Sequence, residues 1–141
     1  MQINLNLFGL LLTITCIFSF AFVTKHSGLE KKYQLIVFEG SDWCVKCRLM
    51  NKNIFSDSTF TRFLQQHNIG LVRVDFPQHN KQAAEEKILN EKIAEKYHFN
   101  GAFPTLILSK TDTLLYKTIS FNNLNSNQLQ SEILTKLKQL E

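Results

Sequence analysis

Two cysteines, Cys44 and Cys47, are the residues of this chain best suited to chemistry. They lie three positions apart, directly after an apolar run and next to Trp43. On a helix this spacing puts both sulfur atoms on one side, about one turn apart. Such a pair can form a reversible disulfide: one thiolate attacks a partner's disulfide, and the second cysteine resolves the mixed disulfide. The spacing therefore indicates a dithiol redox site.

The position of the pair in its helix indicates which cysteine attacks. Cys44 would lie at the helix start, where unpaired N–H groups and the helix dipole stabilise an anion. Lys46 and Arg48 add positive charge nearby. We therefore assign Cys44 as the attacking thiolate and Cys47 as the more buried, resolving thiol.

Half of a zinc site is the alternative interpretation of the same two cysteines. Zinc takes four ligands in structural sites, so histidines would have to supply the others. The histidines of the chain show no ligand spacing: His26, His67, His79 and His98. We therefore expect no metal and no other cofactor.

The length and composition of the chain indicate one domain. It has 141 residues, of which 44% are hydrophobic, which is enough for one core but not for two. The formal net charge is +4, and the basic residues are scattered. No run of Lys or Arg is long enough to suggest nucleic-acid binding, so we expect no nucleic-acid partner.

The first 24 residues differ from the rest because they have no charged side chain. Residues 7–23 are nearly continuous apolar sequence, which predicts either a cleaved signal peptide or an uncleaved membrane anchor. Ser19-Phe20-Ala21 fits a small-x-small cleavage site and favours the signal peptide. We expect export, with a periplasmic domain or one anchored facing the periplasm. If the segment is an anchor, the lysines after it would instead place the domain in the cytoplasm by the positive-inside rule.

The number of cysteines is consistent with a redox pair. The third, Cys16, lies in the N-terminal apolar segment and would be removed with a signal peptide. The mature chain would then have only the dithiol and no structural disulfide framework. We divide the chain into a signal peptide or anchor (1–24), a linker (25–32) and one domain (33–141).

Hydrophobic periodicity predicts an alternation of strands and helices. Strands are expected over 34–39, 71–76, 105–109 and 114–120. Helices are expected to begin near Cys44, after an Asp57 or Ser58 cap, near Ala84 and after an Asn125 or Ser126 cap. The third of these, ending by His98, should bury an apolar stripe of Ala84, Ile88, Leu89, Ile93, Ala94 and Tyr97.

The order of these elements defines the fold class. The first two strands are joined through helices and should be parallel, whereas the last two should form an antiparallel hairpin. This predicts an α/β domain, with a central mixed sheet of about four strands and helices on both faces.

Two motifs together resemble the thioredoxin family. They are Ser41-Asp42-Trp43-Cys44-Val45-Lys46-Cys47 and Gly101-Ala102-Phe103-Pro104-Thr105. The chain is most similar to exported members, including the C-terminal domain of the bacterial membrane thiol-disulfide interchange protein. Val74-Asp75-Phe76-Pro77 also resembles the strand end of small periplasmic thioredoxin-like proteins. The resemblance covers roughly 33–121 and implies a thioredoxin-like fold.

The resemblance implies roles for individual residues. Cys44 would be the nucleophile, Cys47 would resolve, and Pro104 would follow a cis peptide bond and face the dithiol. Backbone beside Pro104 would pair with an extended substrate chain, which gives a predicted substrate-binding set of Trp43, Phe103, Pro104 and Thr105. Without the resemblance, Trp43 could equally be a packed aromatic residue and Pro104 an ordinary loop proline.

One position departs from the family pattern. Thioredoxins usually have a buried acid six residues before the nucleophile, which helps to deprotonate the resolving thiol, and Phe38 occupies that position here. Glu39 is adjacent, but strand alternation places it on the opposite face. Glu39 is either a solvated strand-end residue or a functional one. The proton acceptor for Cys47 is water, or Glu39 after a local shift.

The sequence thus predicts a thiol-disulfide oxidoreductase that reduces or exchanges disulfides in exported proteins, with reduction favoured. Its partners would be protein thiols or disulfides and a membrane or soluble thiol redox protein, with possible membrane attachment through residues 7–23. The alternative is a protein-binding or chaperone-like module of the same fold whose dithiol is not catalytic.

Overall fold

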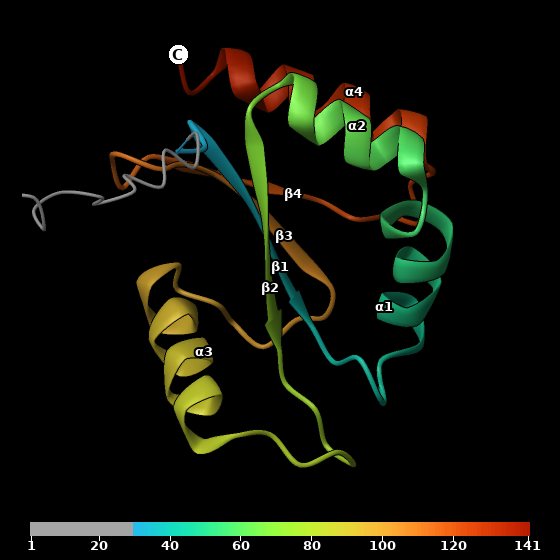
Figure 1. Cartoon of the computed structure of the whole chain (residues 1–141), viewed down its shortest axis with the longest axis vertical. Helices are drawn as coiled ribbons and strands as arrows, with labels where there is room; N and C mark the ends of the chain where they lie inside the picture. The colour runs from blue at the N-terminus through green and yellow to red at the C-terminus, as the bar shows by residue number, and fades with distance from the viewer. Residues whose placement is uncertain (1–29) are drawn as a thin grey trace, which may run out of the picture. The chain divides into compact units, whose positions relative to one another are not determined.

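Four strands form one mixed sheet at the centre of the structure, a computed structural model that describes residues 30–141 (Figure 1). The elements are, in chain order, β1 (Tyr33–Glu39), α1 (Val45–Met50), the π-helical segment η1 (Asn51–Phe55), α2 (Ser58–Gln66), β2 (Ile69–Asp75), α3 (Ala84–Lys96), β3 (Thr105–Lys110), β4 (Tyr116–Ile119) and α4 (Ser126–Lys138). Within 30–141, no helix has the length and apolar character needed to span a membrane. The predictions made for residues 1–24, and the start of the 25–32 linker, lie outside the described residues.

The strands are ordered β2-β1-β3-β4 across the sheet. β1 and β2 pair in parallel, while β3 pairs antiparallel with both β1 and β4. The predicted parallel pair, the hairpin and the mixed sheet of four strands are therefore confirmed. β1 occupies an inner position, which explains why it is almost entirely buried.

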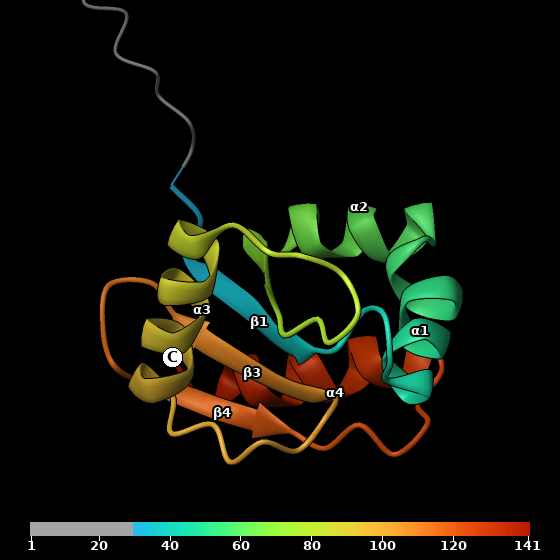
Figure 2. The same cartoon turned by 90° about the horizontal axis from the view of Figure 1, so that it is seen from below.

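Alternation along β1 divides the core between the two faces of the sheet. Leu35 and Val37 pack in a cluster with residues of α1, α2 and α4. Ile36 and Phe38 pack on the other face in a cluster that contains Tyr97, the residue that ends α3. Figures 1 and 2 show α3 on one side of the sheet and α2 and α4 on the other.

The helix starts follow the predicted capping residues. The Asp57 carboxylate accepts the N–H of Thr59 at the start of α2. Asn125 forms a capping box with Gln128 at the start of α4, in which each side chain accepts a backbone N–H of the other residue. These caps satisfy backbone donors that have no partner within the helix.

The predicted boundaries of two strands are wrong. β2 begins at Ile69 rather than 71, because Asn68 alone takes the left-handed turn conformation with φ 56° and Gly70 already pairs with Gln34. β4 is limited to Tyr116–Ile119, since the two leucines before it stay exposed in the turn. By contrast, α3 ends at Lys96, close to the predicted end near His98, which takes the left-handed conformation with φ 50°.

The apolar stripe predicted for α3 is also wrong in its first half. Ile88 is 52% and Leu89 56% exposed, and Ala84 is exposed as well. The buried residue of this helix is Asn90, whose side-chain amide donates to the Asp75 carbonyl at 2.8 Å. A polar contact with the end of β2 thus replaces apolar packing there.

Candidate functional site

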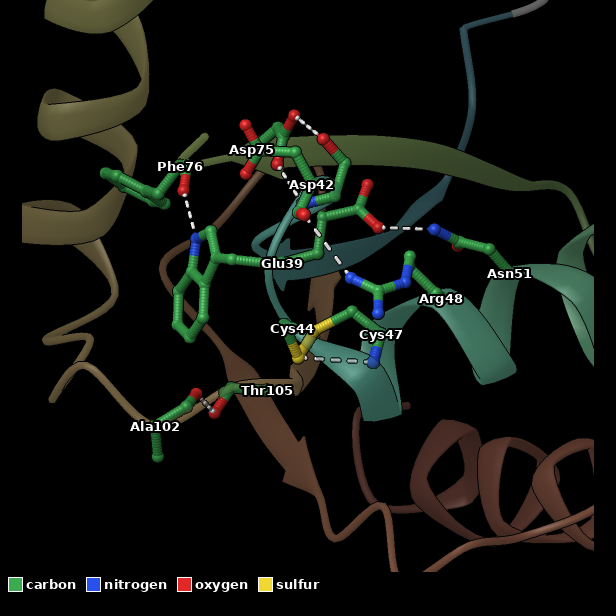
Figure 3. The surroundings of a disulfide bond; sticks show 12 residues. Glu39, Asp42, Cys44, Cys47, Arg48, Asn51, Asp75, Phe76, Ala102 and Thr105 are labelled. Carbon is green, nitrogen blue, oxygen red and sulfur yellow. Dashed lines mark hydrogen bonds between the residues drawn. A yellow bond between two sulfur atoms is a disulfide. The ribbon is translucent and has the colours of Figure 1, made fainter. Parts of the chain in front are cut away.

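The two cysteines lie at the start of α1 and form a disulfide in this structure, with Cα atoms 5.2 Å apart (Figure 3). Cys44 is the N-cap residue of the helix, and its Sγ accepts the backbone N–H of Cys47 at 3.2 Å. Cys44 is 7% exposed and Cys47 is fully buried. The more exposed cysteine of the pair is therefore the one at the helix start, which is the cysteine predicted to attack.

The residues before Cys44, which we call the dithiol loop (residues 40–43), are held by the end of β2 and the segment after it. The Asp75 carboxylate accepts both the Ser41 N–H, at 2.8 Å, and the Ser41 hydroxyl, at 2.5 Å. The Trp43 indole N–H donates to the Phe76 carbonyl at 2.8 Å. Hydrogen bonds thus join the dithiol loop to residues 75 and 76, which are far away in sequence, beside the dithiol (Figure 3).

Asp42 completes this attachment by binding three successive backbone N–H groups. Its carboxylate accepts from Gln78 at 3.0 Å and from His79 and Asn80 at 2.7 Å each. Partial removal from water raises the pKa of Asp42, but these three N–H groups and the nearby His79 more than offset that effect. The net result is a pKa of Asp42 below its ordinary value of 3.8.

Replacing Asp42 with asparagine should therefore destabilise the protein in a pH-dependent way. The pKa of Asp42 is lowered in the folded state, so the ionised carboxylate stabilises the fold above about pH 3.8. This stabilisation is lost as the pH falls through the folded-state pKa. Urea unfolding midpoints from about pH 7 to about pH 2 should show wild type and variant converging in acid. Asp112→Asn, at an exposed carboxylate, is the control; an equal pH-dependent difference for that variant would contradict the assignment to Asp42.

Trp43 combines the two interpretations that the sequence left open. It is half-buried, and its indole packs edge-on against Phe103 with ring centroids 5.1 Å apart. Gly40 lies directly against the same indole, so that a Cβ at position 40 would overlap the ring. Trp43 is therefore a packed residue that still borders the surface beside Cys44.

The segment containing Pro104 precedes β3, and the dithiol loop follows β1. Both therefore lie at the same end of the sheet, because β1 and β3 are antiparallel. The Phe103–Pro104 peptide bond is cis. Thr105 begins β3 opposite Phe38, and its hydroxyl donates to the Ala102 carbonyl at 2.7 Å. Contact between Phe103 and Trp43 brings this segment to the dithiol loop. All of the predicted substrate-binding residues thus lie in two contacting segments.

Glu39 is buried, contrary to its interpretation as a solvated residue. Its side chain is 2% exposed, and its carboxylate accepts from Arg73 Nε and Nη2, at 2.6 Å each, and from the Asn51 amide at 2.9 Å. The Asn51 backbone N–H in turn donates to the Cys47 carbonyl. The buried acid thus contacts the residue that continues the cysteine-bearing helix (Figure 3).

Phe38 lies on the face of the sheet opposite to Glu39, as strand alternation predicted. It is fully buried and stacks on Phe99 with ring centroids 4.3 Å apart. The position at which thioredoxins usually carry an acid is therefore part of an apolar cluster. Within 30–141, no group of three or more His, Cys, Asp or Glu side chains could hold a metal ion.

Comparisons with known proteins identify the family. A family model described as thioredoxin-like matches residues 23–108. Over 89 residues the chain is 37% identical to the disulfide bond reductase DsbH of Chlamydia pneumoniae. The aligned region covers 63% of this chain and 52% of that relative. The chain thus spans about half the length of that curated relative.

Solved structures agree with this assignment. A DsbH oxidoreductase superposes with a TM-score of 0.69 and 31% identity, over 80% of this chain and 77% of the other. A disulphide isomerase from Xylella fastidiosa Temecula1, at 16% identity and a TM-score of 0.50 over 77% of this chain and 79% of the other, supports the fold alone. The chain belongs to the thioredoxin-like family, and the predicted fold is confirmed.

Several residues that hold the site were not assigned roles from the sequence. The sequence identified three of them only as parts of motifs: Ser41, Asp42 and Asp75. In the structure two of these motifs are in contact, because Ser41 donates two hydrogen bonds to the Asp75 carboxylate. Arg73 and Asn51 were not singled out at all. Arg73 could have been suspected because it is a cation within a mostly apolar strand that neighbours a strand ending in Glu39.

Proposed function

We propose that this protein is a thiol-disulfide oxidoreductase that reduces disulfides in other proteins through Cys44 and Cys47. The observation that supports it best is the cysteine pair itself: Cys44 caps a helix and is 7% exposed, while Cys47 is fully buried one turn further on. The name of the curated relative, a disulfide bond reductase, favours reduction over oxidation.

The reaction would proceed in two exchange steps. The Cys44 thiolate attacks one sulfur of the substrate disulfide, forms a mixed disulfide and releases the other substrate cysteine as a thiolate. Cys47, after losing its proton, attacks the Cys44 sulfur and releases the second substrate thiolate. The substrate gains two electrons and Cys44–Cys47 loses two, which yields the disulfide seen here. An external dithiol must then reduce the pair for another cycle.

The surroundings suggest how each cysteine reaches its reactive form. The N–H groups at the start of α1 stabilise a Cys44 thiolate, and no acidic residue lies in the first turn to oppose it. Glu39 is engaged by three hydrogen bonds from Arg73 and Asn51, which favours water as the proton acceptor for Cys47.

Reduction of insulin in the presence of dithiothreitol tests the proposal. Wild-type protein should accelerate the precipitation of insulin chains, and Cys44→Ser should abolish that acceleration because the attacking sulfur is gone. Both proteins should be shown to fold by circular dichroism. Equal rates for the two folded proteins would contradict the catalytic assignment.

We further propose that the protein acts outside the cytoplasm. The uncharged, apolar segment at 7–23 supports export or membrane attachment, and a mature chain with only one cysteine pair suits a cycling dithiol. Full-length protein tagged at its C-terminus should be digested by protease added to spheroplasts with intact inner membranes. Protection of the tag would indicate the cytoplasmic orientation instead.

A non-catalytic binding module is the second candidate. It is favoured by one observation, the placement of Phe38 in an apolar cluster where thioredoxins usually carry an acid. Such a module would bind partners without forming mixed disulfides, which separates it from the first candidate.

A further inference from the structure

A cavity of about 140 Å³ opens beside the dithiol, between the α1–η1 helix and the segment that joins β4 to α4. Besides the polar Lys46, Asn53 and Asn123, the lining consists of five apolar residues: Leu49, Met50, Ile54, Phe121 and Leu124. Two of these, Met50 and Ile54, are core residues, whereas Leu49 is 52% exposed. A cavity of about 150 Å³ with an apolar lining is large enough for one benzene ring. The space therefore fits one apolar side chain.

The lining of the cavity reaches the turn that carries the reactive pair. Lys46, which lies between the two cysteines, also lines the cavity. Val45, in the same turn, is 59% exposed. A polypeptide whose cysteine is bonded to Cys44 must cross this turn or the opposite side of the dithiol, where Trp43 and Phe103 lie. A substrate chain that crosses it passes over the mouth of the cavity.

The charged residue in the lining of the cavity is Lys46. Lys46, Arg48 and Lys52 are exposed along α1 and η1. In the part of the chain from 30 to 141, none of the three forms an ion pair with a carboxylate, and Arg48 donates only to the Asp42 carbonyl, at 3.3 Å. Lys46, which lines the cavity itself, matches a carboxylate on the partner.

We propose that this cavity is a substrate side-chain pocket, which takes a leucine-like or aromatic residue of the substrate polypeptide next to an acidic residue. The inference rests on the proposed function and adds a preference for such sequences near the substrate cysteine. The buried Met50 and Ile54 supply the apolar contact, and Lys46 supplies the charge.

The test uses short peptides that carry one cysteine in a mixed disulfide with glutathione. One series places Leu-Asp at successive distances from the cysteine, and a matched series places Ala-Lys there. Wild type should have a KM about tenfold lower for at least one Leu-Asp peptide than for its Ala-Lys counterpart, since burying a leucine has about this effect on affinity.

Two variants of exposed leucines make the comparison specific. Leu49→Ser should remove most of the difference in KM between the two peptides. Leu89→Ser changes a leucine of similar exposure on α3 and should keep the difference. Equal KM values for the two series with wild type, or equal effects of the two variants, would overturn the pocket.

Two further measurements separate this inference from the proposed function. If wild type does not reduce the disulfides of insulin, the proposed function fails. The pocket is then judged with cysteine-free peptides, by whether Leu-Asp peptides shift the methyl resonances of Leu49 and Leu124 and Ala-Lys peptides do not. Shifts of this kind would support the pocket, and their absence would refute it.

Discussion

Replacing Cys47 with serine should convert a transient mixed disulfide into a stable one. Cys44 keeps its place at the start of α1 and can still attack a substrate disulfide, but no second thiol remains to release the product. Serine is close to cysteine in size, so the fully buried site should tolerate it. Partner proteins should therefore accumulate as adducts that run at higher mass on non-reducing gels and disappear with reductant.

The matched control for this experiment is Cys44→Ser/Cys47→Ser, which keeps the fold and removes the attacking sulfur. It should capture nothing. Trapping in the compartment where the protein resides identifies partners as well as activity. Failure of Cys47→Ser to form adducts with any protein disulfide, including insulin, would favour the non-catalytic binding module.

Replacing Arg73 with methionine should destabilise the protein by about 3 kcal/mol, because it leaves a buried carboxylate without its charged partner. Glu39 is 2% exposed and receives two hydrogen bonds from the guanidinium. Methionine retains an unbranched apolar chain that can pack against Phe55, which the guanidinium contacts in the wild type. Urea unfolding measures the loss.

Two comparisons give this result its meaning. Glu39→Gln/Arg73→Met removes both charges, and most of the lost stability should return. Lys87→Met removes a cation from an exposed pair with Glu91, whose charged atoms are 4.0 Å apart, and should change stability by less than about 0.5 kcal/mol. Similar losses of stability for Arg73→Met and Lys87→Met would show that the buried Glu39–Arg73 pair contributes no more than an exposed ion pair.

The dithiol, the order of strands and helices along the chain and the helix caps were predictable because each depends on local sequence. The spacing of Cys44 and Cys47 fixes their relation on a helix, and Asp57 and Asn125 bind N–H groups within three residues of themselves. Short-range patterns of this kind are the same in any fold that contains them.

The parts that were not predictable depend on contacts between distant segments. Whether Glu39 was solvated or buried depended on Arg73, 34 positions away in the chain and on a neighbouring strand. In the same way, the exposure of Ile88 and Leu89 reflects where α3 meets the sheet, which helical periodicity does not specify. Pairing of β1 with β2 brings these residues together only once the fold exists.

The only tryptophan of the chain lies in the dithiol loop. Its indole is hydrogen-bonded to Phe76, packed on Phe103 and next to Cys44 in sequence. Tryptophan emission from this protein therefore arises entirely at the reactive site. Reduction of the disulfide, occupation by a substrate and loosening of the segment after β2 can each be followed by fluorescence in unlabelled protein, in real time.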